Sequence, residues 1–165
     1  MHCVVDTSVW INLHNGSLLL QALSLIDNGW GFYVTQLVAR ELKNPSVKIL
    51  EQQGVKRYSL SNKEIRESET LRKQKPALSS ADASVIVAAK ALGVSILTDE
   101  RLLREKAKEL GMDVHGTLWL LEQMVENRLV DNDVLCEALD KMSDAGARFP
   151  KDEVKRLKTH YNCPD

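Results

Sequence analysis

The chain has 165 residues, of which 44% are hydrophobic and only 5% aromatic, and its formal net charge is −1. This length suffices for one domain with a buried core, and the balanced charge excludes a global basic field as an argument for nucleic-acid binding. The longest apolar run, Leu18–Leu20, is far too short to span a bilayer, and the amino terminus lacks the basic and apolar regions of a signal peptide. We therefore expect a cytoplasmic protein with no membrane partner.

The amino-terminal half predicts short strands that alternate with helices. Cys3–Val5 is expected to be a strand that ends at Asp6, and a first helix follows around Val9–Leu13. Further strands are expected around Tyr33–Val34 and Val55–Leu60, and further helices at Leu18–Ile26, Gln36–Lys43, Ser46–Gln52 and from Ser61 to about Gln74. The segment Leu18–Ile26 is apolar almost all round, so it is either an ordinary core helix or one that also meets another chain.

The second half is organised around the stretch Leu78–Leu103, LSSADASVIVAAKALGVSILTDERLL. It predicts a helix that ends at Gly93 and then a strand, Ser95–Leu97, which leads to Thr98 and Asp99. A helix at Glu100–Leu110 and a brief strand at Met112–Val114 follow, and then helices at Leu118–Asn127, from Asp131 or Asn132, and from Pro150. Strands therefore stop at Val114, which predicts an α/β fold with a mainly parallel sheet over residues 1–128 and a helical extension of the same domain over residues 129–165.

Four acidic residues are expected to meet at one edge of this sheet. Asp6 and Asp99 follow strands, Asp82 lies near a helix start, and Glu41 is expected to lean back over the edge that holds Asp6. Helices of αβ units start at the edge where the carboxyl ends of the strands lie. Each acid also has an ordinary explanation: Asp6 and Asp99 as helix N-caps, Asp82 as part of a capping box with Ser79, and Glu41 as a solvated side chain.

Carboxylates gathered at one place repel one another, and their pKa values rise unless cations neutralise them. Ligands that are all oxygen, with no histidine or cysteine among them, favour Mg²⁺ or Mn²⁺ over zinc. One or two such ions suit the hydrolysis of a phosphodiester, because one activates a water and the other stabilises the leaving oxygen. The acids therefore predict a metal-dependent hydrolase.

Four segments in this order, VVDTSVWINL, ARELKN, SSADASVIVAAKALG and ILTDERLL, resemble the PIN-domain nucleases. The segments GTLWLLEQMVENRLV and EALDKMSDAGARFPKDEVKRL resemble one PIN branch, so the likeness covers nearly the whole chain. The resemblance implies a PIN-like three-layer α/β/α sandwich and a homodimeric, Mg²⁺- or Mn²⁺-dependent endoribonuclease that hydrolyses RNA. In many relatives the nuclease is the toxin of a toxin–antitoxin pair and is held inactive by a small antitoxin protein.

The same resemblance assigns roles to individual residues. It implies that the catalytic residues and metal ligands are Asp6, Glu41, Asp82 and Asp99. Ser8 and Thr98 are implied as supporting residues, which would hold a ligand or a metal-bound water.

Two other functions compete with the nuclease interpretation. A PIN-like fold could be a catalytically silent module for protein or RNA binding, which metal-binding calorimetry would distinguish from a nuclease. A phosphoacceptor receiver domain is also α/β with clustered acids, but it needs a lysine after a late strand, and here the last predicted strand ends at Val114-His115.

The cysteines Cys3, Cys136 and Cys163 are odd in number and scattered, which favours free thiols in a reducing compartment.

Overall fold

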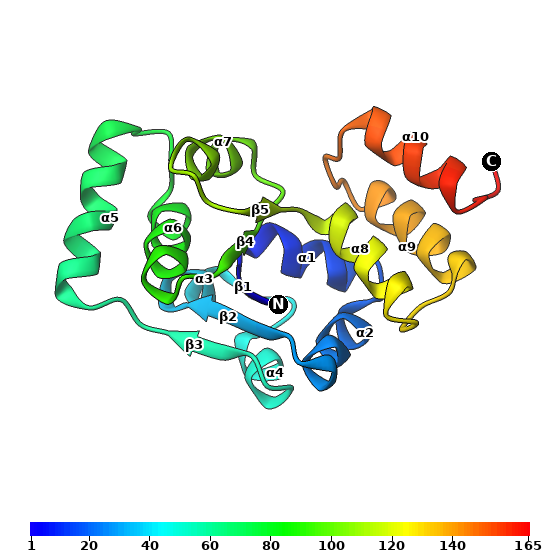
Figure 1. The fold of residues 1–165 in the computed structure, drawn as a ribbon, viewed down its shortest axis with the longest axis horizontal. Helices are drawn as coiled ribbons and strands as arrows, with labels where there is room; N and C mark the ends of the chain where they lie inside the picture. Colours follow the sequence, from blue (N-terminus) through cyan, green and yellow to red (C-terminus); the bar gives the residue numbers. More distant parts are fainter.

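The computed structural model describes all 165 residues and contains a five-stranded sheet in which every pair of neighbours is parallel (Figure 1). Its strands are β1 (His2–Val5), β2 (Gly31–Thr35), β3 (Lys56–Tyr58), β4 (Ser95–Leu97) and β5 (Val114–His115), in the order β3-β2-β1-β4-β5. The chain builds outward from β1 to β3 and then returns to lay β4 on the other side of β1. The strand order therefore reverses between β1 and β4, which makes this the topological switch point of the sheet.

Helices cover both faces of the sheet, and the three-layer α/β/α sandwich expected from the sequence is confirmed. The helices are α1 (Thr7–Asn15), α2 (Leu19–Leu23), the 3₁₀ helix η1 (Ser24–Asn28), α3 (Gln36–Glu41), α4 (Val47–Gln52), α5 (Asn62–Gln74), α6 (Ser80–Leu92), α7 (Arg101–Glu109), α8 (Thr117–Glu126), α9 (Asn132–Asp144) and α10 (Lys151–His160). Helix α6 packs along β1, β2 and β4 and contacts α3, α5 and α7, whereas α1 contacts α2, α8 and α9.

The central helix α6 has both of the end signals that the sequence predicts. Ser79 and Asp82 form a capping box at its start, and Gly93 ends it in the left-handed conformation with φ of +66°. Every residue of α6 from Ala83 to Ala89 is buried, because the helix lies between the sheet and α5. Its alanines and valines allow this close approach on nearly all sides.

The apolar segment Leu18–Ile26 differs from the single α-helix expected. It forms α2 and then the 3₁₀ helix η1, and the change falls at Ser24, whose hydroxyl donates to the carbonyls of Leu20 and Gln21 at 3.0 and 2.9 Å. Most of its apolar side chains belong to the core, but Leu20 is 62% exposed.

No helix of the chain has both the length and the hydropathy needed to cross a membrane.

The expectation of three free thiols is wrong for two of the cysteines. The chain turns back after α9, so that α10 lies beside it (Figure 1), and Cys136 on α9 is bonded to Cys163 just beyond α10. Their Cα atoms are 5.4 Å apart although 27 positions separate them in sequence. Only Cys3, buried in β1, is free. Sequence spacing does not reveal this pairing, because it depends on how the two helices return along each other.

Reduction of the Cys136–Cys163 bond is expected to lower the free energy of unfolding by about 2–4 kcal/mol, because the bond closes a long loop in the unfolded chain. Urea unfolding with and without dithiothreitol measures the change. The Cys163→Ser variant should be equally destabilised and should no longer respond to reductant. An unfolding midpoint that reductant leaves unchanged in the wild-type protein would contradict the prediction.

Candidate active site

The ends of β1 and β4 meet at the carboxyl edge of the sheet, at its switch point. Asp6 follows β1 directly and lies at the amino end of α1, while Thr98 and Asp99 follow β4. The backbone N–H of Asp6 donates to the carbonyl of Leu97 at 2.9 Å, which holds the two strand ends side by side. In open parallel sheets this position is where ligands bind, because the loops diverge and leave a crevice.

Two hydroxyl groups join Asp6 to the end of β4. The Ser8 hydroxyl donates to Asp6 Oδ2 at 3.0 Å and accepts from the backbone N–H of Asp99 at 3.1 Å. The Thr98 hydroxyl donates to the same Asp6 oxygen at 2.9 Å and accepts from the backbone N–H of Glu100 at 3.0 Å. The structure thus places Asp6, Ser8, Thr98 and Asp99 in one hydrogen-bonded network. Asp6 occupies the N-cap position of α1, but its side chain makes no capping hydrogen bond there.

The Asp99 carboxylate is fixed by two residues that the sequence did not single out. Asn12 donates to Asp99 Oδ2 at 2.8 Å, and the backbone N–H of Thr117 donates to Oδ1 at 2.8 Å. The Thr117 hydroxyl also donates to Oδ2. Because α7 has Glu100 as its N-cap residue, the alternative role of Asp99 as the cap of the following helix is wrong. Asp99 instead accepts from the first residue of α8.

Sequence signals for these two residues exist, but they are weak. Asn12 follows Ser8 by four positions on α1, which places both on one face of the helix, and Asn12 is a buried amide among apolar neighbours. Thr117 follows Gly116, where an added Cβ would come within 2.6 Å of Asp99 Oδ1. The backbone can approach the Asp99 carboxylate this closely only because residue 116 has no side chain.

Asp82 and Glu41 lie beside the network, each engaged with a partner of its own. Asp82 accepts from the backbone N–H of Ser79 at 3.0 Å, so the capping-box explanation is correct for its present hydrogen bond. Its charge nevertheless acts on Asp6. Glu41 is exposed at the end of α3 and accepts from the hydroxyl of Thr7, the residue after Asp6, at 2.8 Å.

Asp6 has an unusual electrostatic environment. Its side chain is 2% exposed, and burial followed by the charge of Asp82 raises its pKa from 3.8 to about 6. Hydrogen bonds from Thr98 and Ser8 act in the opposite direction and favour the carboxylate. At neutral pH the site therefore holds a buried negative charge next to a second carboxylate, an arrangement that a cation would stabilise.

The donor chemistry of the site fits a hard divalent cation, since the side chains around Asp6 offer only oxygens. The site is not a ready-made cage, because no three acidic, histidine or cysteine side chains are grouped so that they could hold an ion. Asp82 uses Oδ2 in its capping bond and Glu41 uses Oε2 in its bond to Thr7, so the second oxygen of each carboxylate is available to an ion.

The fold and the site define a parallel α/β domain with acidic side chains at its switch point. The family model of the PIN domain (DUF3368) matches residues 2–162, and the chain belongs to this family. No curated protein matches the chain at a significant level.

Several solved structures are similar to this chain, among them the following two. A PilT N-terminus domain protein from the hyperthermophilic archaeon Sulfolobus solfataricus P2 is 19% identical, with a TM-score of 0.56 over 76% of this chain and 95% of that one. VapBC2 from Rickettsia felis, bound to a DNA fragment from its promoter, is 17% identical, with a TM-score of 0.49 over 70% of this chain and 98% of that one. The first likeness supports the PIN-like fold.

Proposed function

We propose that the protein is a metal-dependent endoribonuclease that hydrolyses RNA phosphodiester bonds with Mg²⁺ or Mn²⁺. Membership of the PIN-domain family supports a nuclease. The observation that carries the proposal is the Ser8 hydroxyl, which donates to the Asp6 carboxylate and accepts from the backbone N–H of Asp99. It thereby holds the acidic residues that follow β1 and β4 in one polar site at the switch point. Phosphodiester hydrolysis is the chemistry that oxygen-ligated divalent ions serve.

The side chains have distinct roles in this proposal. Asp6 and Asp99 are the principal metal ligands and catalytic residues, and Asp82 and Glu41 complete the set. A bound Mg²⁺ or Mn²⁺ supplies a water of lowered pKa and neutralises charge on the phosphate.

Hydrogen-bonding neighbours hold the two principal ligands. Ser8 and Thr98 donate to one oxygen of Asp6 and so keep that carboxylate ionised and oriented. Asn12 and Thr117 donate to one oxygen of Asp99 and so orient its carboxylate. Ligand orientation by such neighbours is a large part of metal affinity.

The proposal is tested by incubating the metal-free protein with a panel of single-stranded and hairpin RNAs. Internal cleavage that needs added Mn²⁺ or Mg²⁺ and stops with EDTA is the expected result. Circularised RNA substrates distinguish internal cuts from trimming of the ends. Intact RNA at millimolar Mn²⁺, across the whole panel, would contradict the proposal.

A second candidate function is a catalytically silent PIN-like module that binds protein or RNA. The spacing of the acidic side chains favours it, since no three acidic, histidine or cysteine side chains are grouped so that they could hold an ion. Calorimetry with Mg²⁺ and Mn²⁺ separates the two candidates. Absence of binding at millimolar ion would favour the silent module.

We extend the first proposal to the assembly and setting of the protein. In this view it is a cytoplasmic homodimer and the toxin of a toxin–antitoxin pair, with a small antitoxin protein as its inhibitor. Light scattering of the purified chain measures the oligomeric state. Expression of a toxin should arrest cell growth. Co-expression with the product of a short neighbouring reading frame should relieve this arrest if that product is the antitoxin.

Replacing Thr117 with valine is expected to lower RNA cleavage by roughly 10- to 100-fold, the usual cost of losing a group that orients a metal ligand. Valine preserves the shape and the backbone N–H bond to Asp99 and removes only the hydroxyl bond. Thr70→Val is the matched control, because the Thr70 hydroxyl bonds only the carbonyl of Arg66 within α5. Cleavage at equal rates by both variants would contradict the role of Thr117.

A further inference from the structure

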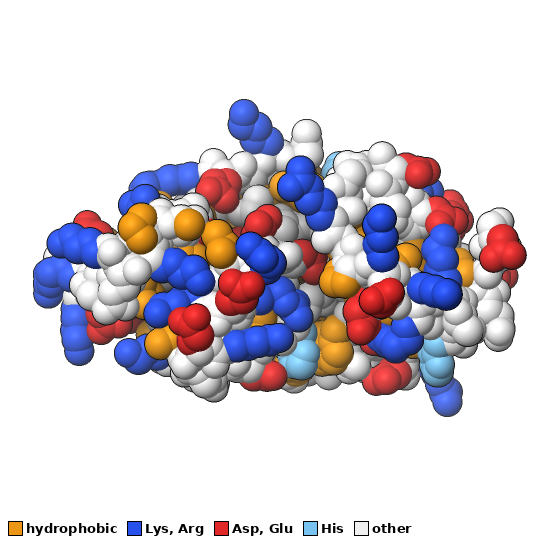
Figure 2. Space-filling model, turned by 90° about the horizontal axis from the view of Figure 1, so that it is seen from above, with side chains coloured by type: hydrophobic (Ala, Val, Ile, Leu, Met, Phe, Trp, Pro, Cys, Tyr) orange, Lys and Arg blue, Asp and Glu red, His pale blue; other side chains and the backbone are white.

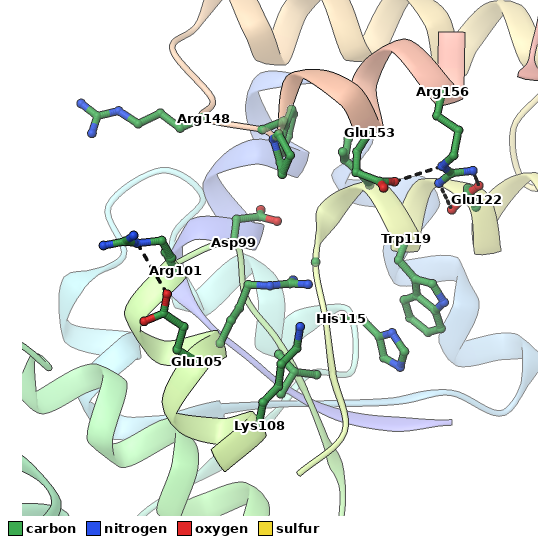
Figure 3. A pocket seen from close by; sticks show the side chains of 16 residues that line it. Asp99, Arg101, Glu105, Lys108, His115, Trp119, Glu122, Arg148, Glu153 and Arg156 are labelled. Carbon is green, nitrogen blue, oxygen red and sulfur yellow. Dashed lines mark hydrogen bonds and ion pairs between the residues drawn. The ribbon is translucent and has the colours of Figure 1, made fainter. Parts of the chain in front are cut away.

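A cleft of about 680 Å³ begins at Asp99 and runs away from the acid site. Figure 3 shows it between α7, which carries Arg101 and Lys108, and the segment that carries Arg148 and enters α10. Residues of β5 and α8, among them His115 and Trp119, also line it. The carboxy-terminal extension therefore supplies one of the cleft walls. None of the acid-site chemistry described above requires this wall.

The face of the molecule seen in Figure 2 carries many Lys and Arg side chains mixed with acidic ones, so charge alone does not mark a binding surface. Inside the cleft the acids are already paired. Glu122 and Glu153 both bind Arg156, and Glu105 lies 3.8 Å from Arg101 (Figure 3). These pairs leave little negative charge in the cleft apart from Asp99.

Three cations of the cleft have no carboxylate partner: Arg104, Lys108 and Arg148. Arg104 donates to the carbonyl of Thr98 at 3.0 Å, which holds its guanidinium next to the acid site. Lys108 and Arg148 are exposed on opposite walls. A surplus of positive charge thus lies directly beside the acids, in a chain whose net charge is −1.

The cleft also offers flat aromatic surface. The His115 ring stacks on Trp119 with the centroids 3.9 Å apart and the planes 15° from parallel. Phe149, half-buried, lies on the wall formed by the extension. Cations alternating with aromatic rings are the arrangement that binds single strands, since phosphates pair with the cations and unpaired bases stack on the rings.

We infer that this cleft binds the single-stranded RNA segment next to the scissile phosphate, and that the carboxy-terminal extension is part of the substrate site. Lys108 and Arg148 contact phosphates from opposite walls, and the His115–Trp119 stack and Phe149 receive bases. The inference rests on the proposed nuclease function and names its substrate as RNA with an unpaired stretch.

The test measures binding apart from cleavage. Fluorescence anisotropy measures the binding of a labelled, unstructured RNA oligonucleotide to the whole protein. EDTA is present so that no strand is cut. The Lys108→Ala/Arg148→Ala double variant should bind about tenfold more weakly. The slope of log affinity against log salt should fall by about 1.4, because each single-strand phosphate contact contributes about 0.7. His115→Ala should weaken binding roughly fivefold or more with little change in this slope.

Lys151→Ala/Lys155→Ala is the charge-matched control. These two lysines are exposed on α10, have no ion pair, and lie outside the cleft. The control should bind the RNA like the wild-type protein. Equal losses in both double variants, or no loss in either, would overturn the inference. Tighter binding of a blunt RNA duplex than of the single strand would also overturn it, as would binding of neither RNA.

Kinetics separate this inference from the proposed function. In Mn²⁺ the Lys108→Ala/Arg148→Ala variant should raise KM by about tenfold and leave kcat within about twofold, because phosphate contacts away from the reacting bond act on binding. If the protein binds RNA in the cleft as described but cuts none, the nuclease proposal fails alone. If it cuts RNA and the double variant is unaffected in both KM and affinity, the cleft inference fails alone.

Discussion

Replacing Asp6 or Asp99 with asparagine is expected to abolish Mn²⁺-dependent RNA cleavage while leaving the fold intact. Both residues lie at the switch point, and the Ser8 hydroxyl joins the Asp6 carboxylate to the backbone N–H of Asp99. An amide removes the negative charge that a divalent ion needs from its ligand, and metal stabilisation of a phosphoryl transition state is worth several kcal/mol. We expect kcat/KM to fall by roughly 10³-fold or more in each variant, measured on the best RNA of the panel.

Asp27→Asn is the matched control for this experiment. Asp27 is exposed in η1, just before β2, and so lies at the opposite, amino edge of the sheet. The control should cleave RNA at the wild-type rate. Circular dichroism and the unfolding temperature verify that the site variants are folded. If folded Asp6→Asn and Asp99→Asn variants both cleave normally, the two acids are not the metal site.

The convergence of Asp6 and Asp99 could be predicted from the sequence because it depends on topology alone. Each residue follows an apolar strand, and parallel strands present their carboxyl ends at one edge. How close the two residues lie depends on whether their strands are neighbours in the sheet. The sequence does not give that order, and the structure places β1 and β4 next to each other.

The residues that orient Asp99 could not be predicted in the same way. Asn12 and Thr117 lie 87 and 18 positions from it in sequence. They reach it only because α1 and the start of α8 pack at the same strand end. The cleft is harder still to predict, since Lys108 and Arg148 line opposite walls only because the segment between α9 and α10 lies across from α7.

Two explanations were possible for Asp82, a capping box with Ser79 and a place among the acids at the sheet edge, and the two are compatible. Its side chain caps α6, and the same position brings its charge close enough to Asp6 to raise that pKa. A short acidic side chain in the first turn of a helix satisfies the helix and faces the strand ends at once. Local sequence rules identify the cap, the αβ topology predicts that this helix start lies at the carboxyl edge of the sheet, and the structure adds that the charge of Asp82 acts on Asp6.

The metal-free protein is expected to lose stability between about pH 4 and pH 6 because of Asp6. Burial and the charge of Asp82 raise its pKa from 3.8 to about 6 in the folded state. Below pH 4 the Asp6 side chain is protonated in both the folded and the unfolded state, so it does not change the free energy of unfolding. As the pH rises, the unfolded chain releases this proton first, so the folded state is penalised until the pH passes its own pKa. A gap of about two pKa units corresponds to roughly 3 kcal/mol.

Asp6→Asn isolates this contribution, because asparagine has nearly the same shape and never ionises. Urea unfolding in EDTA should show the variant and the wild-type protein to be about equally stable at pH 4, and the variant more stable by roughly 3 kcal/mol at pH 8. Mn²⁺ should stabilise the wild-type protein at pH 8 and have little effect on the variant. Parallel pH profiles of the two proteins would show that Asp6 titrates normally. A variant that is more stable and yet inactive would show that the same buried charge which weakens the metal-free fold is the one that binds the ion.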